Sequence, residues 1–252
     1  MENETTNAVA VIPARWDSSR FPGKPLALIA GRPMIAHVVE RARGARRISS
    51  VIVATDDRRV FDAAVQAGAE AVMTGECASG TDRVAAAALC RDDWQICVNV
   101  QGDEPLLSAR NIDVLVGGMA AAPRTEMATL CRPLDLDRVT DPNAVKVVRR
   151  ADGRALYFSR AQIPYPRRVG EAAVQPRLHL GIYGYRRAGL ETFVGLAPSP
   201  LERTESLEQL RALEHGMEIL VLDAPDPAFG VDTPEDLERA EQMMRRRQAK
   251  GD

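Results

Sequence analysis

The stretch VAVIPARWDSSRFPGKP, residues 9–25, sets the N-terminal architecture and gives the first indication of function. Its first four residues form a short apolar run that predicts a buried strand. The loop that follows carries three cations, Arg15, Arg20 and Lys24, and its prolines and glycine are incompatible with a regular helix or strand. Backbone amides and cationic side chains in a loop after the first strand of an α/β protein suit a polyphosphate. We therefore expect this loop to bind the phosphates of a nucleotide.

The loop belongs to neither of the two common nucleotide-binding types. G-x4-G-K-[ST] is absent from the chain, and no G-x-G-x-x-G follows a strand-like segment. This argues against P-loop NTPases and Rossmann dehydrogenases.

Apolar strand-like segments alternate with helical patterns through the first half of the chain. The expected strands are 9–12, 51–54, 71–73 and 96–100, and helices are expected at 34–43, at 60–67 and in an Ala-rich stretch after residue 83. This β-α-β-α order predicts an α/β fold with a Rossmann-like, mostly parallel sheet that carries helices on both faces.

After about residue 125 the pattern becomes more antiparallel. Asp152-Gly153 separates the alternating segments 145–150 and 154–158, which is a strong hairpin signal. Residues 179–186 alternate as a further strand. We expect one domain over residues 1–252 that includes an inserted, smaller and more antiparallel lobe at about 125–215.

Two helix starts are marked near the C-terminal end. Ser199-Pro200-Leu201-Glu202 has the pattern of a capping box, and the helix it begins is expected to run to about His215. Residues 219–222 predict a late strand. Thr233-Pro234 then predicts the cap of a last helix.

Composition excludes several classes of protein. The 252 residues are 45% hydrophobic and 27% charged, and the net charge of −2 gives no support to nucleic-acid binding. No apolar run approaches the ~20 residues of a membrane span, and the acidic N-terminus is unlike a secretory signal. Cys77, Cys90, Cys97 and Cys131 form no C-x-x-C pair, so reduced, buried thiols and a cytoplasmic location are expected.

Two aspartates are candidates for metal binding. Asp103 follows the fourth expected strand and Asp232 follows a late one, and ligands in open α/β sheets bind beyond the carboxyl ends of strands. Since Thr233 already offers a helix cap, Asp232 is available for a ligand. Mg²⁺ binds one or two carboxylates together with phosphate oxygens and water. We expect Asp103 and Asp232 to hold Mg²⁺ beside a triphosphate.

Two further segments have ligand-binding character. Gly102 would let the backbone approach a ligand closely, and Gln101 offers both a donor and an acceptor. The polar segment 79–83 is either a second ligand-facing loop or an ordinary helix cap at Ser79 or Thr81.

These residues resemble the signature of the sugar nucleotidyltransferases, and in particular of the 3-deoxy-manno-octulosonate cytidylyltransferase family. The similar segments are Arg-x3-Ser-Arg-Phe-Pro-Gly-Lys-Pro-Leu at 15–26, Gly31–Ile35, Asn143–Val148, Leu156–Ala161, His179–Tyr185 and Leu207–Arg211. The resemblance extends from about Val9 to Arg239. The chain departs from the commonest family pattern at Trp16-Asp17 and at Ala228-Phe229-Gly230.

The resemblance implies the transfer of CMP from CTP to a 3-deoxy-octulosonate, with Mg²⁺ as cofactor. In this interpretation the anomeric hydroxyl of the sugar acid attacks the α-phosphorus and pyrophosphate leaves, for lipopolysaccharide biosynthesis. The catalytic residues would be Arg15, Lys24, Asp103 and Asp232; the nucleotide-binding residues Ala14, Arg15, Ser19, Arg20, Lys24, Thr81, Arg83 and Gln101; and the sugar-binding residues Gln101, Arg160, His179, Tyr183, Tyr185, Glu208 and Gln209. Arg83 would lie near the cytidine and Arg160 would meet the sugar carboxylate.

Four alternatives remain open, three of which concern the acceptor. The acceptor could be an amino-substituted octulosonate or a sialic-acid-like acid, and a polyol phosphate fits the acceptor motifs less well. The fourth alternative is a non-catalytic protein that binds nucleotide-sugars. The presence of Lys24, Asp103 and Asp232 counts against it, because such a protein would not need to retain them.

The family further implies a homodimer that forms through the inserted lobe.

Overall fold

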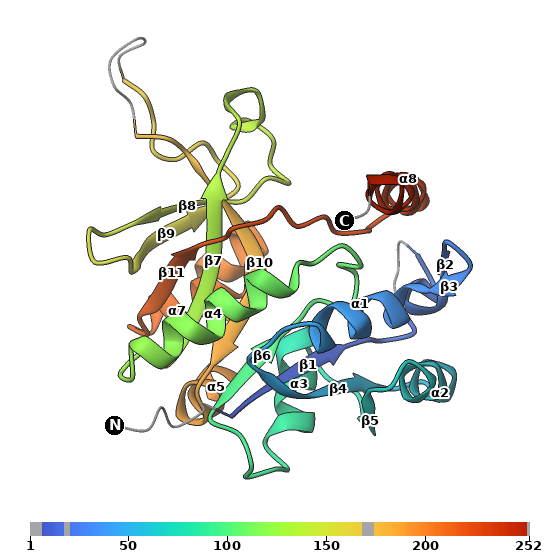
Figure 1. Ribbon diagram of the computed structural model, residues 1–252. Coiled ribbons are helices and arrows are strands. Elements are labelled where there is room, and N and C mark those ends of the chain that lie inside the picture. The colour runs from blue at the N-terminus through green and yellow to red at the C-terminus, as the bar shows by residue number, and fades with distance from the viewer. Residues whose placement is uncertain (1–6, 18–20, 168–173, 251–252) are drawn as a thin grey trace.

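The computed structural model describes residues 7–17, 21–167 and 174–250, with side chains up to residue 246. Its centre is one large sheet (Figure 1), in which seven strands follow one another and a hairpin adds to one of them. In order across the sheet, the seven are β11 (Ile219–Asp223), β7 (Met127–Pro133), β10 (Arg177–Tyr185), β6 (Ile96–Asn99), β1 (Ala8–Pro13), β4 (Ile48–Thr55) and β5 (Glu70–Met73). Only β10 is antiparallel to its neighbours, β6 and β7. The expected mostly parallel sheet is confirmed.

Helices cover both faces of this sheet (Figure 1). They are α1 (Met34–Arg43), α2 (Arg58–Gln66), α3 (Gly80–Ala88), α4 (Ala109–Ala121), α5 (Arg187–Gly195), α6 (Pro200–Glu205), α7 (Gln209–Glu214) and α8 (Pro234–Lys250). Short elements complete the chain: the 3-10 helices η1 (Lys24–Leu26) and η2 (Leu136–Arg138) and the strand pair β2 (Leu28–Ile29) and β3 (Arg32–Pro33).

Strand β1 is apolar on both sides because both sides are buried. Ala10 and Ile12 pack into one core with α1, α2 and α4, whereas Val9 and Val11 pack into a second core with α3, α5 and α7. Full burial of a valine or isoleucine side chain stabilises the folded state by ~1.5–3 kcal/mol relative to exposure. This two-sided burial explains the continuous apolar run at residues 9–12.

The hairpin predicted around Asp152-Gly153 is present as β8 (Lys146–Arg149) and β9 (Ala155–Ser159). Gly153 has a φ of 87°, a left-handed conformation that glycine adopts at little cost. The hairpin attaches to the central sheet through the pairing of β8 with β10. Residues 125–215 thus supply both this hairpin and two strands of the central sheet, β7 and β10.

The single helix expected from Ser199 to His215 is wrong, since two helices occupy this range. The capping box between Ser199 and Glu202 is confirmed and begins α6. Ser206 then takes a left-handed conformation (φ 52°) and ends α6, and α7 begins at Gln209. Glu205, the last residue of α6, contacts the hairpin: its carboxylate accepts hydrogen bonds from the Ser159 hydroxyl (2.6 Å) and the Arg160 amide (2.8 Å).

The segment after β11 crosses back over the molecule to α8, which lies beside β2 and β3 (Figure 1). Val231 is fully buried in a small core with residues of β2 and α8, and its N–H donates to the Asp103 carbonyl (2.8 Å). Thr233 accepts a bond from the Asp236 amide (3.2 Å), as expected of a helix cap. Asp232 therefore reaches the edge of the sheet through an irregular segment rather than directly from a strand.

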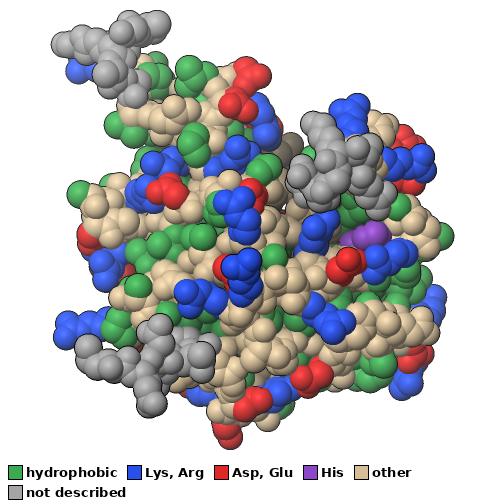
Figure 2. Space-filling model, in the orientation of Figure 1, with side chains coloured by type: hydrophobic (Ala, Val, Ile, Leu, Met, Phe, Trp, Pro, Cys, Tyr) green, Lys and Arg blue, Asp and Glu red, His purple; other side chains and the backbone are tan. Residues whose placement is uncertain are grey.

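Charges of both signs are interspersed on the face shown in Figure 2. Ion pairs between surface side chains include Arg149–Asp223 and Arg154–Glu218. None of the described helices is long and apolar enough to cross a membrane.

The four cysteines are free thiols, but the expectation that all are buried is wrong. Cys97 and Cys131 are buried, Cys77 is half-buried and Cys90 is exposed.

Candidate active site

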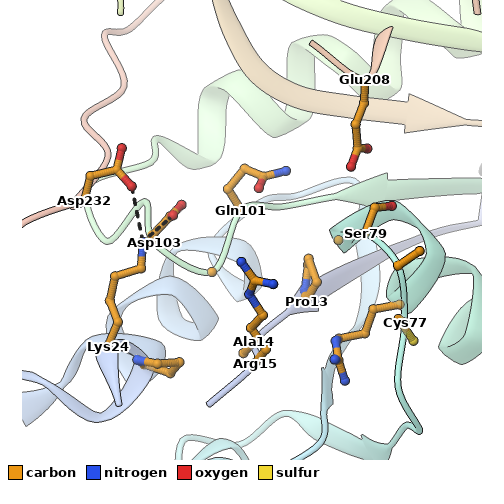
Figure 3. Close-up of a pocket in the computed structure, with 15 residues that line it drawn as sticks. Pro13, Ala14, Arg15, Lys24, Cys77, Ser79, Gln101, Asp103, Glu208 and Asp232 are labelled. Atoms are coloured by element: carbon orange, nitrogen blue, oxygen red, sulfur yellow. Dashed lines mark hydrogen bonds and ion pairs between the residues drawn. The ribbon is translucent and has the colours of Figure 1, made fainter. Parts of the chain in front are cut away.

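A cavity of about 360 Å³ opens at the carboxyl ends of β1 and β6 (Figure 3). One side is formed by the loop after β1 together with η1, and the opposite side by the loop before α3. The residues that line it are Pro13, Ala14, Arg15, Lys24, Pro25, Cys77, Ala78, Ser79, Gly80, Arg83, Gln101, Gly102, Asp103, Glu208 and Asp232. Eight of the candidate site residues thus meet in one place: Ala14, Arg15, Lys24, Arg83, Gln101, Asp103, Glu208 and Asp232. Ser19 and Arg20 lie outside the described residues.

Gly23 gives the cationic loop its turn. It has a φ of 72° and begins η1, which places Lys24 at the first position of that short helix. A Cβ at Gly23 would lie only 2.8 Å from the ring of Trp16, so the loop closes tightly only with glycine here. Arg15 is exposed and lines the same cavity. The loop therefore presents Arg15 and Lys24 to one space, as a polyphosphate requires.

Lys24 lies between the two candidate metal ligands (Figure 3). Its Nζ is 2.7 Å from Asp103 Oδ2 and 3.6 Å from Asp232 Oδ1, and it donates to the Val231 carbonyl at 2.9 Å. The Lys24 side chain is 13% exposed, whereas the two carboxylates are 32% and 51% exposed. The carboxylates of Asp103 and Asp232 therefore face one point from opposite segments of the chain while remaining open to solvent.

This donor set fits Mg²⁺ together with a triphosphate. Two carboxylates that converge on one point, with open positions beside them, match the preference of Mg²⁺ for few protein ligands plus phosphate oxygens and water. Within the described residues, no three His, Cys, Asp or Glu side chains gather into a complete metal cage. Phosphate oxygens and water would have to complete the coordination.

Glu104 is a half-buried acid beside this pair that the sequence interpretation did not single out. Burial raises the pKa of Glu104 to about 8, and the negative charge of Asp103 adds to the shift. Glu104 directly follows Asp103 in the chain but is not among the residues that line the cavity.

Gly102, which follows β6, packs closely against Pro13 at the end of β1. A Cβ at this position would lie 2.7 Å from the Pro13 carbonyl oxygen, too close for any side chain. The glycine was predicted to allow the approach of a ligand. The contact that requires it is with the backbone of Pro13.

Asp56 connects two walls of the cavity, and the sequence interpretation missed it. Its Oδ1 accepts the Trp16 amide (3.1 Å), and its Oδ2 accepts the Arg83 guanidinium (2.7 Å). Arg83 is only 5% exposed and also donates to the Thr74 hydroxyl. Asp56 lies just after β4 in the sequence Thr55-Asp56-Asp57, and its place at a carboxyl strand end was the one available signal.

A chain of hydrogen bonds links Gln101 to Glu208. Gln101 donates to Asn99 Oδ1 (3.3 Å), Asn99 donates to Thr81 Oγ1 (3.4 Å), and the Thr81 hydroxyl donates to Glu208 Oε2 (2.7 Å). Asn99 and Thr81 are buried. Because the Glu208 carboxylate can only accept, it fixes the direction of the whole chain. Thr81 lies in the first turn of α3, which Ser79 caps, and through Asn99 it connects Gln101 to Glu208.

Three aromatic side chains on β10 lie in a row next to this chain. The rings of His179, Tyr183 and Tyr185 follow one another with centroids 5.5 and 6.2 Å apart, as the alternation of the strand predicted. Burial lowers the pKa of His179 to about 3, so its imidazole is neutral near pH 7. Its Nε2 is 3.0 Å from the Thr129 hydroxyl. Burial also raises the pKa of both tyrosines, which keeps their hydroxyls protonated.

Arg160 and Gln209 are not among the residues that line the cavity. The Arg160 guanidinium donates to the carbonyls of Glu205 (2.6 Å), Pro142 (2.9 Å) and Ser206 (3.4 Å), and so joins the hairpin to α6. Gln209 is 3% exposed and its Nε2 has no partner among the described atoms. Their assignment to the sugar acid stays a prediction.

Comparison with known proteins adds to this geometry. A family model described as cytidylyltransferase matches residues 9–219. The 3-deoxy-manno-octulosonate cytidylyltransferase of Anaeromyxobacter dehalogenans is 54% identical over 94% of the chain and 98% of its own length. The enzyme of the same name from Myxococcus xanthus is 50% identical over 97% and 99%.

The fold of this protein is also similar to those of solved structures. A CMP:2-keto-3-deoxy-manno-octonic acid synthetase complexed with CTP has a TM-score of 0.90 and 42% identity, and the match covers 96% of this chain and 99% of that one. A cytidylyltransferase from Leptospira borgpetersenii has a TM-score of 0.61 at 18% identity and shares the fold.

The fold and the cavity, with these matches, define the class as a nucleotidyltransferase that uses CTP. Within that class the identity to relatives extends over nearly their whole length. The chain belongs to the 3-deoxy-manno-octulosonate cytidylyltransferase family.

Proposed function

We propose that this protein transfers CMP from CTP to 3-deoxy-D-manno-octulosonate, yielding CMP-octulosonate and pyrophosphate. The observation that carries the proposal is the junction of Lys24, Asp103 and Asp232 within one cavity. It combines a phosphate-binding cation with two carboxylates that converge on one point. Relatives that are about half identical carry the corresponding name.

The chemistry is an in-line displacement at phosphorus. The anomeric hydroxyl of the sugar acid attacks the α-phosphorus of CTP, the bond to the β-phosphate oxygen breaks, and the hydroxyl proton is lost to solvent. Arg15 and Lys24 neutralise the triphosphate and the charge that develops on the departing pyrophosphate. Asp103 and Asp232 would hold Mg²⁺, which would supply positive charge to the phosphates and favour ionisation of the attacking hydroxyl.

The nucleotide base would lie at the other end of the cavity. Arg83 lines that end, and its charge is balanced by Asp56. A cation that is already paired can offer N–H donors to a neutral base without a net charge. The Lys24 end, by contrast, faces the phosphates.

The sugar acid would contact Gln101 and Glu208. Both line the cavity and both carry oxygens that can accept bonds from sugar hydroxyls. Tyr183 and His179 would support this side from β10. The Arg160 guanidinium has five N–H donors and gives three of them to backbone carbonyls, so one N–H on each terminal nitrogen would be left for the acceptor carboxylate.

Pyrophosphate release with each of the four nucleoside triphosphates tests the proposal. We expect release only with CTP, and only when the octulosonate is present. Replacing the octulosonate with its amino-substituted analogue or with a sialic acid measures acceptor choice. Release from CTP that is equal with and without any sugar acid would refute the transferase assignment.

We also propose that the enzyme works as a cytoplasmic homodimer in lipopolysaccharide biosynthesis. CTP is a cytoplasmic substrate, and octulosonate is a constituent of lipopolysaccharide. Leu136, Tyr165 and Val174 are 71%, 80% and 72% exposed within residues 125–215, which supports a contact through this part of the chain. Sedimentation velocity at assay concentration should show a dimer. A species that stays monomeric would contradict this.

A further inference from the structure

Lys24 occupies the point on which the two carboxylates converge. Its ammonium has three N–H donors, and three oxygens surround it: Asp103 Oδ2, the Val231 carbonyl and Asp232 Oδ1, at 2.7, 2.9 and 3.6 Å. An ammonium is a compact point charge on a flexible stem, so it can take the place of a metal ion between two carboxylates. The positive charge that the two aspartates need is therefore already present in the nucleotide-free protein.

The position of Lys24 in the chain determines which ligand can draw its side chain away from the two carboxylates. Lys24 comes from the loop that lines the phosphate side of the cavity, whereas Asp103 and Asp232 come from the ends of β6 and of the segment before α8. A triphosphate bound at the loop brings several negative charges to the same ammonium. Lys24 can then exchange carboxylate partners for phosphate oxygens by rotating its side chain, without movement of the sheet.

We propose that Lys24 is a stand-in cation that keeps Asp103 and Asp232 together in the nucleotide-free enzyme and weakens their affinity for a free divalent cation. The carboxylates become available when a polyphosphate draws the ammonium away, so the divalent cation enters with the nucleotide or after it. This inference depends on the proposed function only in taking a triphosphate as the group that attracts the ammonium.

Binding of Mn²⁺ to the nucleotide-free protein, measured by electron paramagnetic resonance, tests this without any turnover. Lys24→Met should bind Mn²⁺ with a dissociation constant at least tenfold lower than that of the wild type, because the two close carboxylates lose the positive charge that Lys24 supplies. Lys24→Gln should behave like Lys24→Met. Lys24→Arg retains the charge and should bind as weakly as the wild type.

Two controls identify the site. Adding Asp103→Asn to Lys24→Met should abolish the gained affinity. Arg32→Met removes the same charge from an exposed pair with Glu40 (2.7 Å) and should leave Mn²⁺ binding unchanged. In thermal unfolding, Mn²⁺ should raise the Tm of Lys24→Met more than that of the wild type.

Equal Mn²⁺ affinity in the wild type and Lys24→Met would overturn the inference, as would a gain that survives Asp103→Asn. Failure of this inference can be distinguished from failure of the proposed function. If the wild type formed no CMP-octulosonate while Lys24→Met gained the Mn²⁺ site, the transferase proposal would fail and the role of Lys24 toward the two carboxylates would stand.

Discussion

Asp103→Asn is expected to lower kcat by about two to four orders of magnitude at saturating Mg²⁺, which is roughly 3–5 kcal/mol at the transition state. The amide keeps the size of the side chain but removes one of the two charged groups proposed to hold the metal beside the α-phosphate. Asp232→Asn should have an effect of the same size, because the two carboxylates converge on one point. Steady-state release of pyrophosphate gives kcat for both variants.

The fold should survive both substitutions. The Asp103 contact that helps to position Val231 uses the backbone carbonyl, which asparagine retains. Asp62→Asn is the matched control, since it removes a negative charge from an exposed i,i+4 pair with Arg58. It should leave kcat unchanged. An Asp103→Asn enzyme with nearly wild-type kcat at saturating Mg²⁺ would show that this carboxylate has only a structural role.

Asp56→Asn should raise the KM for CTP by about 10- to 100-fold. Asparagine can still offer an oxygen to the Trp16 amide, but its NH₂ group would face the Arg83 guanidinium where an acceptor is needed. A charge-assisted hydrogen bond contributes about 1.5–3 kcal/mol, and here the cation left without its partner is buried. The KM for the octulosonate should stay within about twofold. CTP titrations at fixed sugar, and the reverse, separate the two effects.

Combining Asp56→Asn with Arg83→Met shows whether Asp56 acts through Arg83. Contacting residues that work as a unit are non-additive. The double variant should therefore bind CTP no worse than Arg83→Met alone. Fully additive losses would contradict the coupling and would place the effect of Asp56 at Trp16 and the phosphate loop instead.

The N-terminal half of the fold was predictable because its signals are local. Residues 9–12 are apolar on both sides since both sides are buried, and the loop after them carries its cations within a few positions of one another. The hairpin at Asp152-Gly153 and the capping box at Ser199 are equally local patterns, and both are present.

The remaining features depend on contacts between distant segments. Strand β7 is buried on both faces and has no alternation to mark it, and nothing in the sequence predicts the left-handed conformation of Ser206. Both fall in the second half of the chain. Asp56 gains its role only because Trp16 and Arg83 meet there from segments 40 and 27 residues away.

The candidate site likewise includes residues that local sequence patterns identify and residues that they do not. Lys24 and Asp103 could be singled out from their own neighbourhoods, and the structure brings them within 2.7 Å. The acceptor residues carry weaker local signals. Arg160 was assigned by resemblance to the sugar carboxylate, but its donors go to three backbone carbonyls.

The identity of the reaction product decides whether this protein joins CMP to octulosonate. Wild-type protein incubated with CTP, Mg²⁺ and 3-deoxy-D-manno-octulosonate should be followed by mass spectrometry of the nucleotide fraction together with an assay of pyrophosphate. We expect a species with the mass of CMP joined to octulosonate, formed one for one with pyrophosphate and absent when the sugar acid is omitted. Consumption of CTP that yields free CMP or CDP, with no CMP-octulosonate, would contradict this expectation.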